Sequence, residues 1–563
     1  MISIKIRKLR REFIKFNIDG YVVPKNDEYF NEYSSPDRLN FISNFDGSAG
    51  LAIILKDKNY LFVDGRYTTQ AESQSGKNFN IVKIHKKLPW KVLKHKIKIG
   101  YNPYYFTSLS LKRYFKNYFM LVPIYSDLLI KNVQKKISQK FYFIENNVSG
   151  ENSKSKISKV LKFLHKDKSD CLFVTAPENV AWLLNLRGRD NPHSPIPNCR
   201  MILKKSGKMF LFANKSKIQN LFSNYNLKKI KILKESNINI FLKELGSKKI
   251  VLDRLSCSLA YENIINKKIN ISNKNDPIYN LKSIKNDIEI KNLIKSHILD
   301  GVAVIKFLYW IKNLKKNISE LEAEKKLNFF RKRSKKYLFP SFNTIAASGP
   351  NGAIIHYRAN QNSNRIIKKN DIFLCDSGGQ YEYGTTDITR TIGFGKQSNR
   401  IKDIFTYVLK GHIAVASANL NKLTSAHFLD TLARKFLKKK GLDYPHSTGH
   451  GVGYFLNVHE GPIAISKDYK IMLQPGQVMS NEPGFYQKDK FGIRLENMIY
   501  VKKIQNKTFF KNLTVVPFDK ELINFKLLTK KEKDYLINYN LEIYSNVEKY
   551  LTYEEKFWLL SQF

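Results

Sequence analysis

The sequence has few cysteines, no long apolar run and a shortage of acidic residues, and each shortage excludes a class of protein. Four cysteines in 563 residues, none in a C-x-x-C spacing, cannot form a disulfide framework and favour a reducing compartment. A transmembrane helix needs about 18 consecutive apolar residues, and the sequence holds no such run. The basic N-terminus also lacks the continuous apolar stretch of a secretory signal. We therefore expect a cytoplasmic protein that makes no membrane contact.

Acidic residues are outnumbered about two to one. Lys and Arg total 97 against 48 Asp and Glu, which gives a net charge of +49 and a pI of about 9.8. Such a charge is typical of proteins that bind nucleic acid. The lysines, however, are spread over the whole length, and we find no RNP, KH, zinc-finger or basic-zipper pattern. We interpret the charge as a drift of composition toward Lys, Asn and Ile, and expect no specific nucleic-acid partner.

Apolar residues are abundant enough for several cores. Hydrophobic residues make up 42% of the chain and aromatic residues 13%, and the length predicts about three to five domains. Residues 1–140 have the pattern of a small α/β domain, with a basic amphipathic helix and strands at 20–24, 51–55 and 59–65. Residues 141–283 repeat this order of elements, with a strand at 171–175, a helix at 177–188 ending in glycine, and a hairpin at 200–213. The repetition indicates a duplicated domain.

The pattern changes near Asp287, which we expect to cap a long helix reaching about Leu314. A second helix is predicted to start at Ser319, because Glu322 stands at capping-box spacing from it. We take 284–508 as one domain, which becomes strand-rich and dense in His, Asp and Glu from residue 340. The remaining residues, 509–563, are predicted to be a helical extension that serves packing or dimer formation.

Two acidic residues stand out in the segment 371–394. Asp376 follows a short apolar strand, and Asp387 begins a second strand after a glycine turn. Because side chains alternate along a strand, Asp387, Thr389 and Thr391 share one face. An antiparallel hairpin would bring Asp376 beside Asp387, and two adjacent buried carboxylates repel unless a proton or a cation lies between them.

A second pair of acidic residues follows the same logic. Glu482 and Glu496 end opposing apolar strands in the segment 478–501, which would add two carboxylates to the pocket. Between the two pairs lies HSTGHGVGYFLNVHEGP, 446–462, in which glycines let the backbone approach a site closely around His450. One imidazole with four carboxylates suits Mn²⁺, Co²⁺ or Zn²⁺, and five such ligands can hold two ions.

These motifs resemble those of the pita-bread metallopeptidases, and specifically Xaa-Pro aminopeptidases of the long, three-domain type. The matching segments are PNGAIIHY, DSGGQYEYGTTDITRT, HSTGHGVGYFLNVHEGP, SNEPGFY and GIRLEN, with FDGSAG and VDGRY in the first domain. The resemblance implies an α/β (α+β) chain in which two related creatinase-type domains precede a pita-bread catalytic domain. It also implies release of the N-terminal residue from peptides with proline in second position, by a water nucleophile that two metal ions activate.

The resemblance also assigns site residues. It implies a metal-ligand set of Asp376, Asp387, His450, Glu482 and Glu496, with two divalent ions per chain, Mn²⁺ before Zn²⁺ or Co²⁺. Glu482 would be the acid–base group, and His356 and His459 would contact the scissile carbonyl and the substrate backbone. His446, Arg66 and Arg494 would belong to the substrate-binding part of the site. Arg494 also stands two residues before Glu496 on the same strand face, so we expect it to pair with a ligand carboxylate. The long type also implies a homodimer.

Three alternatives remain open at this point. One is another enzyme of the same fold, above all a prolidase acting on Xaa-Pro dipeptides, although the duplicated N-terminal half argues against it. A second is creatinase, which needs no metal and which five intact ligands disfavour. The third is a non-catalytic pita-bread protein that binds partners such as nucleic acid through its basic surface.

Overall fold

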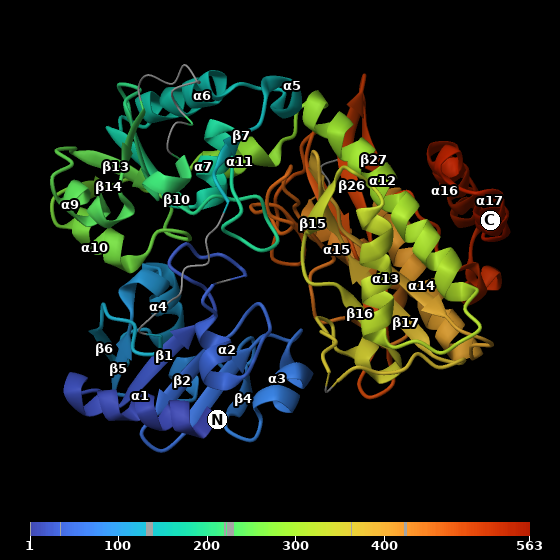
Figure 1. Ribbon diagram of the computed structural model, residues 1–563, viewed down its shortest axis with the longest axis horizontal. Coiled ribbons are helices and arrows are strands. Elements are labelled where there is room, and N and C mark those ends of the chain that lie inside the picture. The colour runs from blue at the N-terminus through green and yellow to red at the C-terminus, as the bar shows by residue number, and fades with distance from the viewer. Residues whose placement is uncertain are drawn as a thin grey trace. The chain divides into compact units, whose positions relative to one another are not determined.

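The computed structural model divides the chain into two compact units. It describes residues 2–33, 35–130, 139–218, 221, 230–361, 363–421 and 425–563. The first unit comprises residues 1–146 and 151–279, and the second comprises 147–150 and 280–563 (Figure 1). No helix in the described residues is long and apolar enough to cross a membrane. The predicted boundaries between individual domains stay predictions.

The first unit begins with helix α1 (Ile2–Phe16), which buries Ile6, Leu9 and Phe13 on one face. A six-stranded sheet follows. Its strands in spatial order are β4 (Asn80–Lys83), β3 (Asn59–Val63), β2 (Leu51–Leu55), β1 (Gly20–Pro24), β5 (Lys98–Tyr101) and β6 (Met120–Pro123). Helices α2 (Arg38–Ser43), α3 (Thr68–Ser75) and α4 (Ser108–Phe115) connect them. The strands predicted at 20–24 and 51–55 are confirmed with these bounds, and the strand predicted at 59–65 ends at Val63.

A second six-stranded sheet repeats the first. Its order is β12 (Ile230–Leu233), β11 (Met209–Ala213), β10 (Cys199–Lys204), β8 (Cys171–Val174), β13 (Lys249–Leu252) and β14 (Asn270–Ile271). In both sheets the second, third and fourth strands in this order pair antiparallel, and all other pairings are parallel. Equal order and equal strand directions confirm the predicted duplication. The helices that accompany the second sheet include α6 (Ser153–Lys166), α9 (Ile238–Lys243) and α10 (Leu259–Asn266).

The helix predicted at 177–188 is shorter than expected. Helix α7 spans Pro177–Leu184, and Asn185 ends it in the left-handed conformation with φ 55°. Asparagine tolerates that conformation better than most residues, so it can act as a helix stop. Leu186 and Arg187 then form strand β9, which pairs with β7 (Tyr142–Phe143). The prediction of Gly188 as the helix end is therefore wrong.

Long helices precede and follow the sheets of the catalytic part of the second unit. They are α12 (Asp287–Lys312), α13 (Glu320–Lys332), α14 (Asn399–Ala416) and α15 (Ala426–Lys438), and α12 packs beside α13 (Figure 1). Ser319 caps α13 in a capping box with Glu322, as predicted. The cap of α12 is Asn286 and not Asp287, because the Asn286 side chain accepts from two backbone amides while Glu289 completes the box.

Short antiparallel sheets carry the site residues of this unit. Strands β16 (Ile345–Ser348), β17 (Ile372–Ser377) and β20 (Ile388–Gly393) form one sheet, and β23 (Val478–Asn481), β26 (Asn497–Ile504) and β27 (Lys507–Asn512) form another. The smaller pieces are β15 (Tyr337–Pro340) with β18 (Gly379–Tyr381) and β19 (Gly384–Thr385), β21 (Gly449–His450) with β22 (Ala464–Ile465), and β24 (Gly484–Gln487) with β25 (Phe491–Arg494). Apolar side chains of α12, α14, β17 and β20 share one core.

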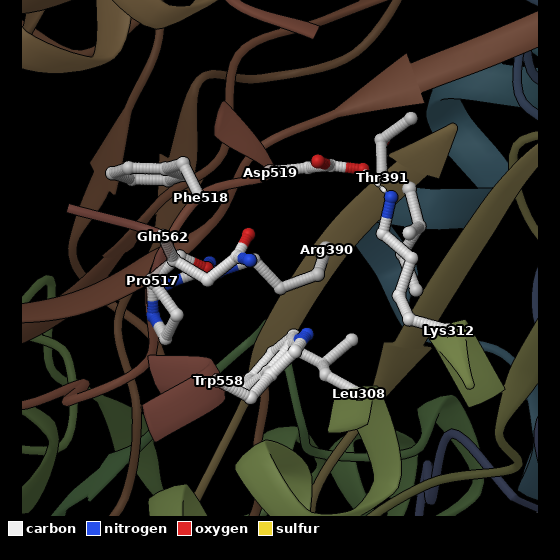
Figure 2. A pocket seen from close by; sticks show the side chains of 10 residues that line it. Leu308, Lys312, Arg390, Thr391, Pro517, Phe518, Asp519, Trp558 and Gln562 are labelled. Carbon is white, nitrogen blue, oxygen red and sulfur yellow. Dashed lines mark hydrogen bonds and ion pairs between the residues drawn. The ribbon is translucent and has the colours of Figure 1, made fainter. Parts of the chain in front are cut away.

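The C-terminal extension packs on this same core. Helix α16 (Lys530–Val547) buries Leu536, Tyr539 and Ile543 there, and α17 (Tyr553–Ser561) follows it. Figure 2 shows a small cavity at this junction. Its lining comes from α12, β20 and the C-terminal segment: Leu308, Lys312, Arg390, Thr391, Ile392, Pro517, Phe518, Asp519, Trp558 and Gln562.

Candidate metal centre

The first two carboxylates lie on neighbouring antiparallel strands. Asp376 in β17 pairs in register with Thr389 of β20, and Asp387 stands two residues before Thr389. Residues two apart on a strand share a face, so Asp376 and Asp387 are diagonal neighbours on one side of the sheet. The opposite face of β20 carries Ile388 and Ile392, both in the core. Both aspartates are buried, as the predicted hairpin requires.

The second two carboxylates are also set by strand pairing. Asn481 of β23 pairs with Asn497 of β26, and Glu482 and Glu496 are the next residues beyond that pair. Glu496 forms an isolated antiparallel bridge with Thr389, and the Thr389 hydroxyl donates to Glu496 Oε2 at 2.7 Å. This contact joins the second hairpin to the strand that follows Asp387.

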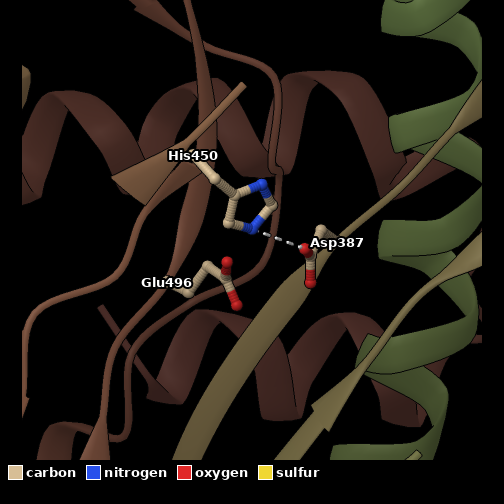
Figure 3. A group of neighbouring side chains, drawn as sticks. All are labelled: Asp387, His450 and Glu496. Atoms are coloured by element: carbon tan, nitrogen blue, oxygen red, sulfur yellow. Dashed lines mark ion pairs between the residues drawn. The ribbon is translucent and has the colours of Figure 1, made fainter. Parts of the chain in front are cut away.

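His450 completes the group from a third segment. Its backbone N–H donates to Ser480 Oγ at 3.0 Å, and its Nδ1 lies 3.0 Å from the Gly451 carbonyl oxygen. A carbonyl oxygen only accepts, so Nδ1 carries a proton and Nε2 faces the acids. Nε2 lies 3.4 Å from Asp387 Oδ2 and 3.8 Å from Glu482 Oε1. Figure 3 shows the imidazole pointing toward Asp387 and Glu496.

Glycine is required on either side of this imidazole. A Cβ on Gly449 would lie 2.0 Å from the Ser480 carbonyl oxygen, and one on Gly451 would lie 2.3 Å from that of Glu460. Neither contact is possible for a larger residue. The predicted close approach of backbone around His450 is therefore present.

The crowding of carboxylates shifts their proton affinities. Burial raises the pKa of Asp376 to about 6. The neighbouring Asp387 carboxylate adds to this rise, and the Arg494 guanidinium opposes it. Burial likewise raises the pKa of Glu482, and burial with three neighbouring carboxylates raises that of Glu496 far above its ordinary value. Burial lowers the pKa of His450, but Asp387 and Glu482 outweigh it and raise it to about 9. The cluster therefore favours added positive charge.

The donor set fits divalent ions. One ligand atom each of Asp387, His450 and Glu496 lie within 4.8 Å of one another. Asp376 Oδ1 is buried, and no hydrogen-bond partner for it exists among the described residues. A buried carboxylate oxygen without a donor costs free energy, which a cation would offset. Four carboxylates and one imidazole are ligands that Mn²⁺, Co²⁺ and Zn²⁺ accept.

Arg494 is paired with a carboxylate of the cluster, the role that its position on the strand predicted. Its NH2 donates to Asp376 Oδ2 at 2.6 Å. Its NH1 donates to the Tyr486 hydroxyl at 2.7 Å, and that hydroxyl lies 2.9 Å from His446 Nε2. His446 therefore lies at the edge of the site. The sequence did not single out Tyr486, although its place four residues after Glu482 in SNEPGFY was a usable signal.

The other predicted histidines lie close to this network. The ring of His459 is 4.3 Å from that of His450, edge to face. His356 follows Ile355, whose carbonyl oxygen accepts from Arg494 NH2 at 3.3 Å. The side chains of His356 and His459 are both half-buried.

Arg66 belongs to the first unit and is not placed relative to this cluster. Its guanidinium is paired with Asp64 at 2.7 Å. The predicted contact of Arg66 with substrate stays a prediction.

Arg390 is a buried residue that the sequence did not indicate. Its NH1 donates to the Glu496 carbonyl oxygen at 2.7 Å, and its Nε and NH2 donate to the carbonyl oxygens of Pro517 and Val516. Arg390 thus ties the backbone of a ligand residue to the C-terminal segment. Only the fold reveals this link, because 106 residues separate Arg390 from Glu496.

Family models match four consecutive parts of the chain. The metallopeptidase family M24 model matches residues 291–503, and the model for the C-terminal region of peptidase M24 matches 508–562. Models of the creatinase/prolidase N-terminal domain match 5–124 and 133–289. Two matches to N-terminal domain models agree with the duplicated sheets.

Relatives match over nearly the full length. A protein of Laccaria bicolor named probable Xaa-Pro aminopeptidase P is 35% identical, over 97% of this chain and 90% of that protein. The crystal structure of an X-prolyl aminopeptidase from Caenorhabditis elegans, described as a cytosolic enzyme with a di-nuclear active site, matches with a TM-score of 0.93 and 29% identity, covering 100% of this chain and 99% of that one. A prolidase from Pyrococcus horikoshii matches with a TM-score of 0.54 and 27% identity, over 65% of this chain and 99% of that one.

Proposed function

Because the chain belongs to metallopeptidase family M24, on its Xaa-Pro aminopeptidase P branch, we propose that it is a metal-dependent aminopeptidase. It releases the N-terminal residue from peptides whose second residue is proline. The observation that carries the proposal is the convergence of Asp387, His450 and Glu496 from three separate segments, in a chain that matches an X-prolyl aminopeptidase over its whole length.

Length separates this proposal from its nearest alternative. The prolidase match covers 65% of the chain, because a prolidase of that kind has no counterpart for the remainder. A chain with two N-terminal sheets and a C-terminal extension is therefore expected to prefer Xaa-Pro-Yaa peptides over Xaa-Pro dipeptides.

In the proposed mechanism, Asp376, Asp387, His450, Glu482 and Glu496 hold two divalent ions. When bound, the ions activate a water molecule and polarise the scissile carbonyl. Asp387 and Glu496 would each offer a carboxylate to the ions, and His450 would offer Nε2, because its Nδ1 is committed to the Gly451 carbonyl oxygen.

Proton movement in this mechanism falls to Glu482. Its carboxylate takes the proton of the attacking water and passes it to the leaving proline nitrogen. His459 and His356 donate to the carbonyl oxygen as it gains negative charge. His446 forms part of the pocket wall, Arg494 holds Asp376, and Arg66 contacts substrate from the N-terminal part.

The test compares two substrates on one metal-loaded preparation. An Xaa-Pro-Yaa tripeptide should be hydrolysed at the Xaa–Pro bond, and the matching Xaa-Pro dipeptide far more slowly. Turnover restricted to the dipeptide would make the protein a prolidase. No turnover of either peptide, with metal bound, would reject the aminopeptidase assignment.

The finer properties belong to the same proposal. We infer that the native ion is Mn²⁺, with Zn²⁺ or Co²⁺ as substitutes, and that the enzyme acts in the cytoplasm. We also infer a homodimer. Apolar side chains that a second copy could cover are exposed on α17, where Tyr553, Phe557 and Leu560 are 80%, 70% and 48% exposed. Light scattering should show a dimer that Phe557→Glu weakens, and a monomeric wild type would reject this part.

A further inference from the structure

Three fully buried charged side chains lie beside the metal centre, and the mechanism above does not use them. Lys285 Nζ is 2.7 Å from Glu460 Oε1, and Lys282 Nζ is 3.3 Å from Glu460 Oε2. The three side chains are 1–2% exposed. Taking ions out of water is costly, so an ion cluster of this kind is weak evidence for stability. Its presence calls for another role.

The backbone of Glu460 leads from this cluster to the proposed ligand His450. Glu460 N–H donates to the Gly451 carbonyl oxygen at 2.8 Å. The same oxygen accepts from His450 Nδ1 at 3.0 Å. Gly451 N–H in turn donates to the Ile463 carbonyl oxygen at 2.8 Å. The Gly451 carbonyl oxygen thus accepts from both the His450 imidazole and the Glu460 backbone. Gly451 is also held through its own N–H, which donates to Ile463.

The position of this oxygen decides what His450 can do. A metal-ligating histidine is oriented by the acceptor of its other ring N–H, which fixes both the tautomer and the direction of the lone pair. If the Gly451 oxygen moved, Nε2 would no longer point at Asp387. Glu460 also follows His459 directly in the chain, and the His459 ring lies 4.3 Å from that of His450. Glu460 is therefore linked through the backbone to both His450 and His459.

We propose that Glu460, locked by Lys282 and Lys285, is a positioning residue that holds the Gly451 carbonyl oxygen and thereby orients His450 for metal binding. The Glu460 carboxylate is outside the proposed ligand set; it acts through the backbone. The two lysines belong to the segment just before α12, at the start of the catalytic unit, so this segment fastens the 451–460 loop. The proposal rests on the proposed metal site, and it is independent of the preference for proline.

The first test uses Glu460→Gln, which keeps the side-chain shape but removes the negative charge that faces Lys282 and Lys285. Calorimetric titration of the metal-free full chain with Mn²⁺ should show affinity about 10–100-fold weaker than in the wild type, the usual loss when a partner of a ligand is removed. The matched control is Glu555→Gln, which breaks the Lys306–Glu555 pair elsewhere in the same unit. It should lower the melting temperature and leave Mn²⁺ affinity unchanged.

A second variant separates positioning from stability. Glu460→Gln combined with Lys285→Met removes two of the charges, so the melting temperature should recover relative to Glu460→Gln alone. Mn²⁺ affinity should stay weak, because the anchor is still missing. If affinity recovers together with stability, or if folded Glu460→Gln binds Mn²⁺ like the wild type, the positioning role is refuted. A wild type that binds none of Mn²⁺, Zn²⁺ and Co²⁺ would instead refute the proposed function.

Discussion

Removal of the metal ions should make the protein lose stability as the pH rises. Without cations, the protonated form of Asp376 is favoured, and burial raises its pKa from 3.8 to about 6. The folded state then holds a proton that the unfolded chain has released, so stability falls as pH rises from about 4 to 6 and the penalty persists above that window. Glu482 and Glu496 shift in the same direction.

His450 extends the loss to higher pH. Burial works against its charged form, but Asp387 and Glu482 prevail and raise its pKa from 6.5 to about 9. A raised histidine pKa contributes stability that is complete below about 6.5 and is lost as pH rises through about 9. The metal-free protein should therefore lose stability continuously from pH 4 to 9.

The expected size follows from the shifts. Two pKa units on Asp376 correspond to about 3 kcal/mol, and bound cations should remove this penalty because they stabilise the ionised carboxylates. The gap in melting temperature between metal-loaded and metal-free protein should widen from pH 4.5 to 8 by roughly 5–10 °C.

Calorimetric melting of both forms over this pH range measures the gap. In Asp376→Asn, which cannot titrate at this position, the metal-free form should show a flatter decline between pH 4 and 6. A gap that stays constant or narrows as pH rises would refute the reasoning, because it would mean that the carboxylates are not forced together in the absence of metal.

Three further predictions concern the site and the charge. Asp387→Asn removes one negative charge from a proposed metal ligand, so we expect loss of at least one metal ion per chain and nearly all activity with the fold retained. Normal hydrolysis of Xaa-Pro peptides would make the assignment of Asp387 wrong. His459→Ala should keep its metal, as elemental analysis can check, while turnover falls about 100–1,000-fold; metal loss would make His459 a ligand. Binding to duplex DNA or RNA should fade between about 50 and 200 mM salt, while peptide hydrolysis stays nearly constant; tight, sequence-selective binding at 200 mM would contradict compositional drift.

The site was predictable where motifs and strand periodicity carry it. Alternation along β20 placed Thr389 and Thr391 on one face and Ile388 and Ile392 on the other, and the structure agrees, since the two threonines contact Glu496 and Arg494. Hairpin logic brought Glu482 and Glu496 together. These relations are local, so spacing along the chain suffices to find them.

Contacts between distant segments were not predictable. Glu460 and Lys285 are 175 residues apart, and nothing in either segment marks them as partners. The left-handed stop at Asn185 and the cap at Asn286 were missed for a different reason: several neighbouring residues could serve, and tertiary packing chooses among them.

The most direct test of the account combines metal analysis with peptide hydrolysis on one preparation. The purified chain, loaded with Mn²⁺ and freed of excess ion, should contain about two ions per chain and should release the first residue of an Xaa-Pro-Yaa peptide, and a chelator should abolish both. Hydrolysis that survives complete metal removal, or a loaded protein that leaves such peptides intact, would contradict the account.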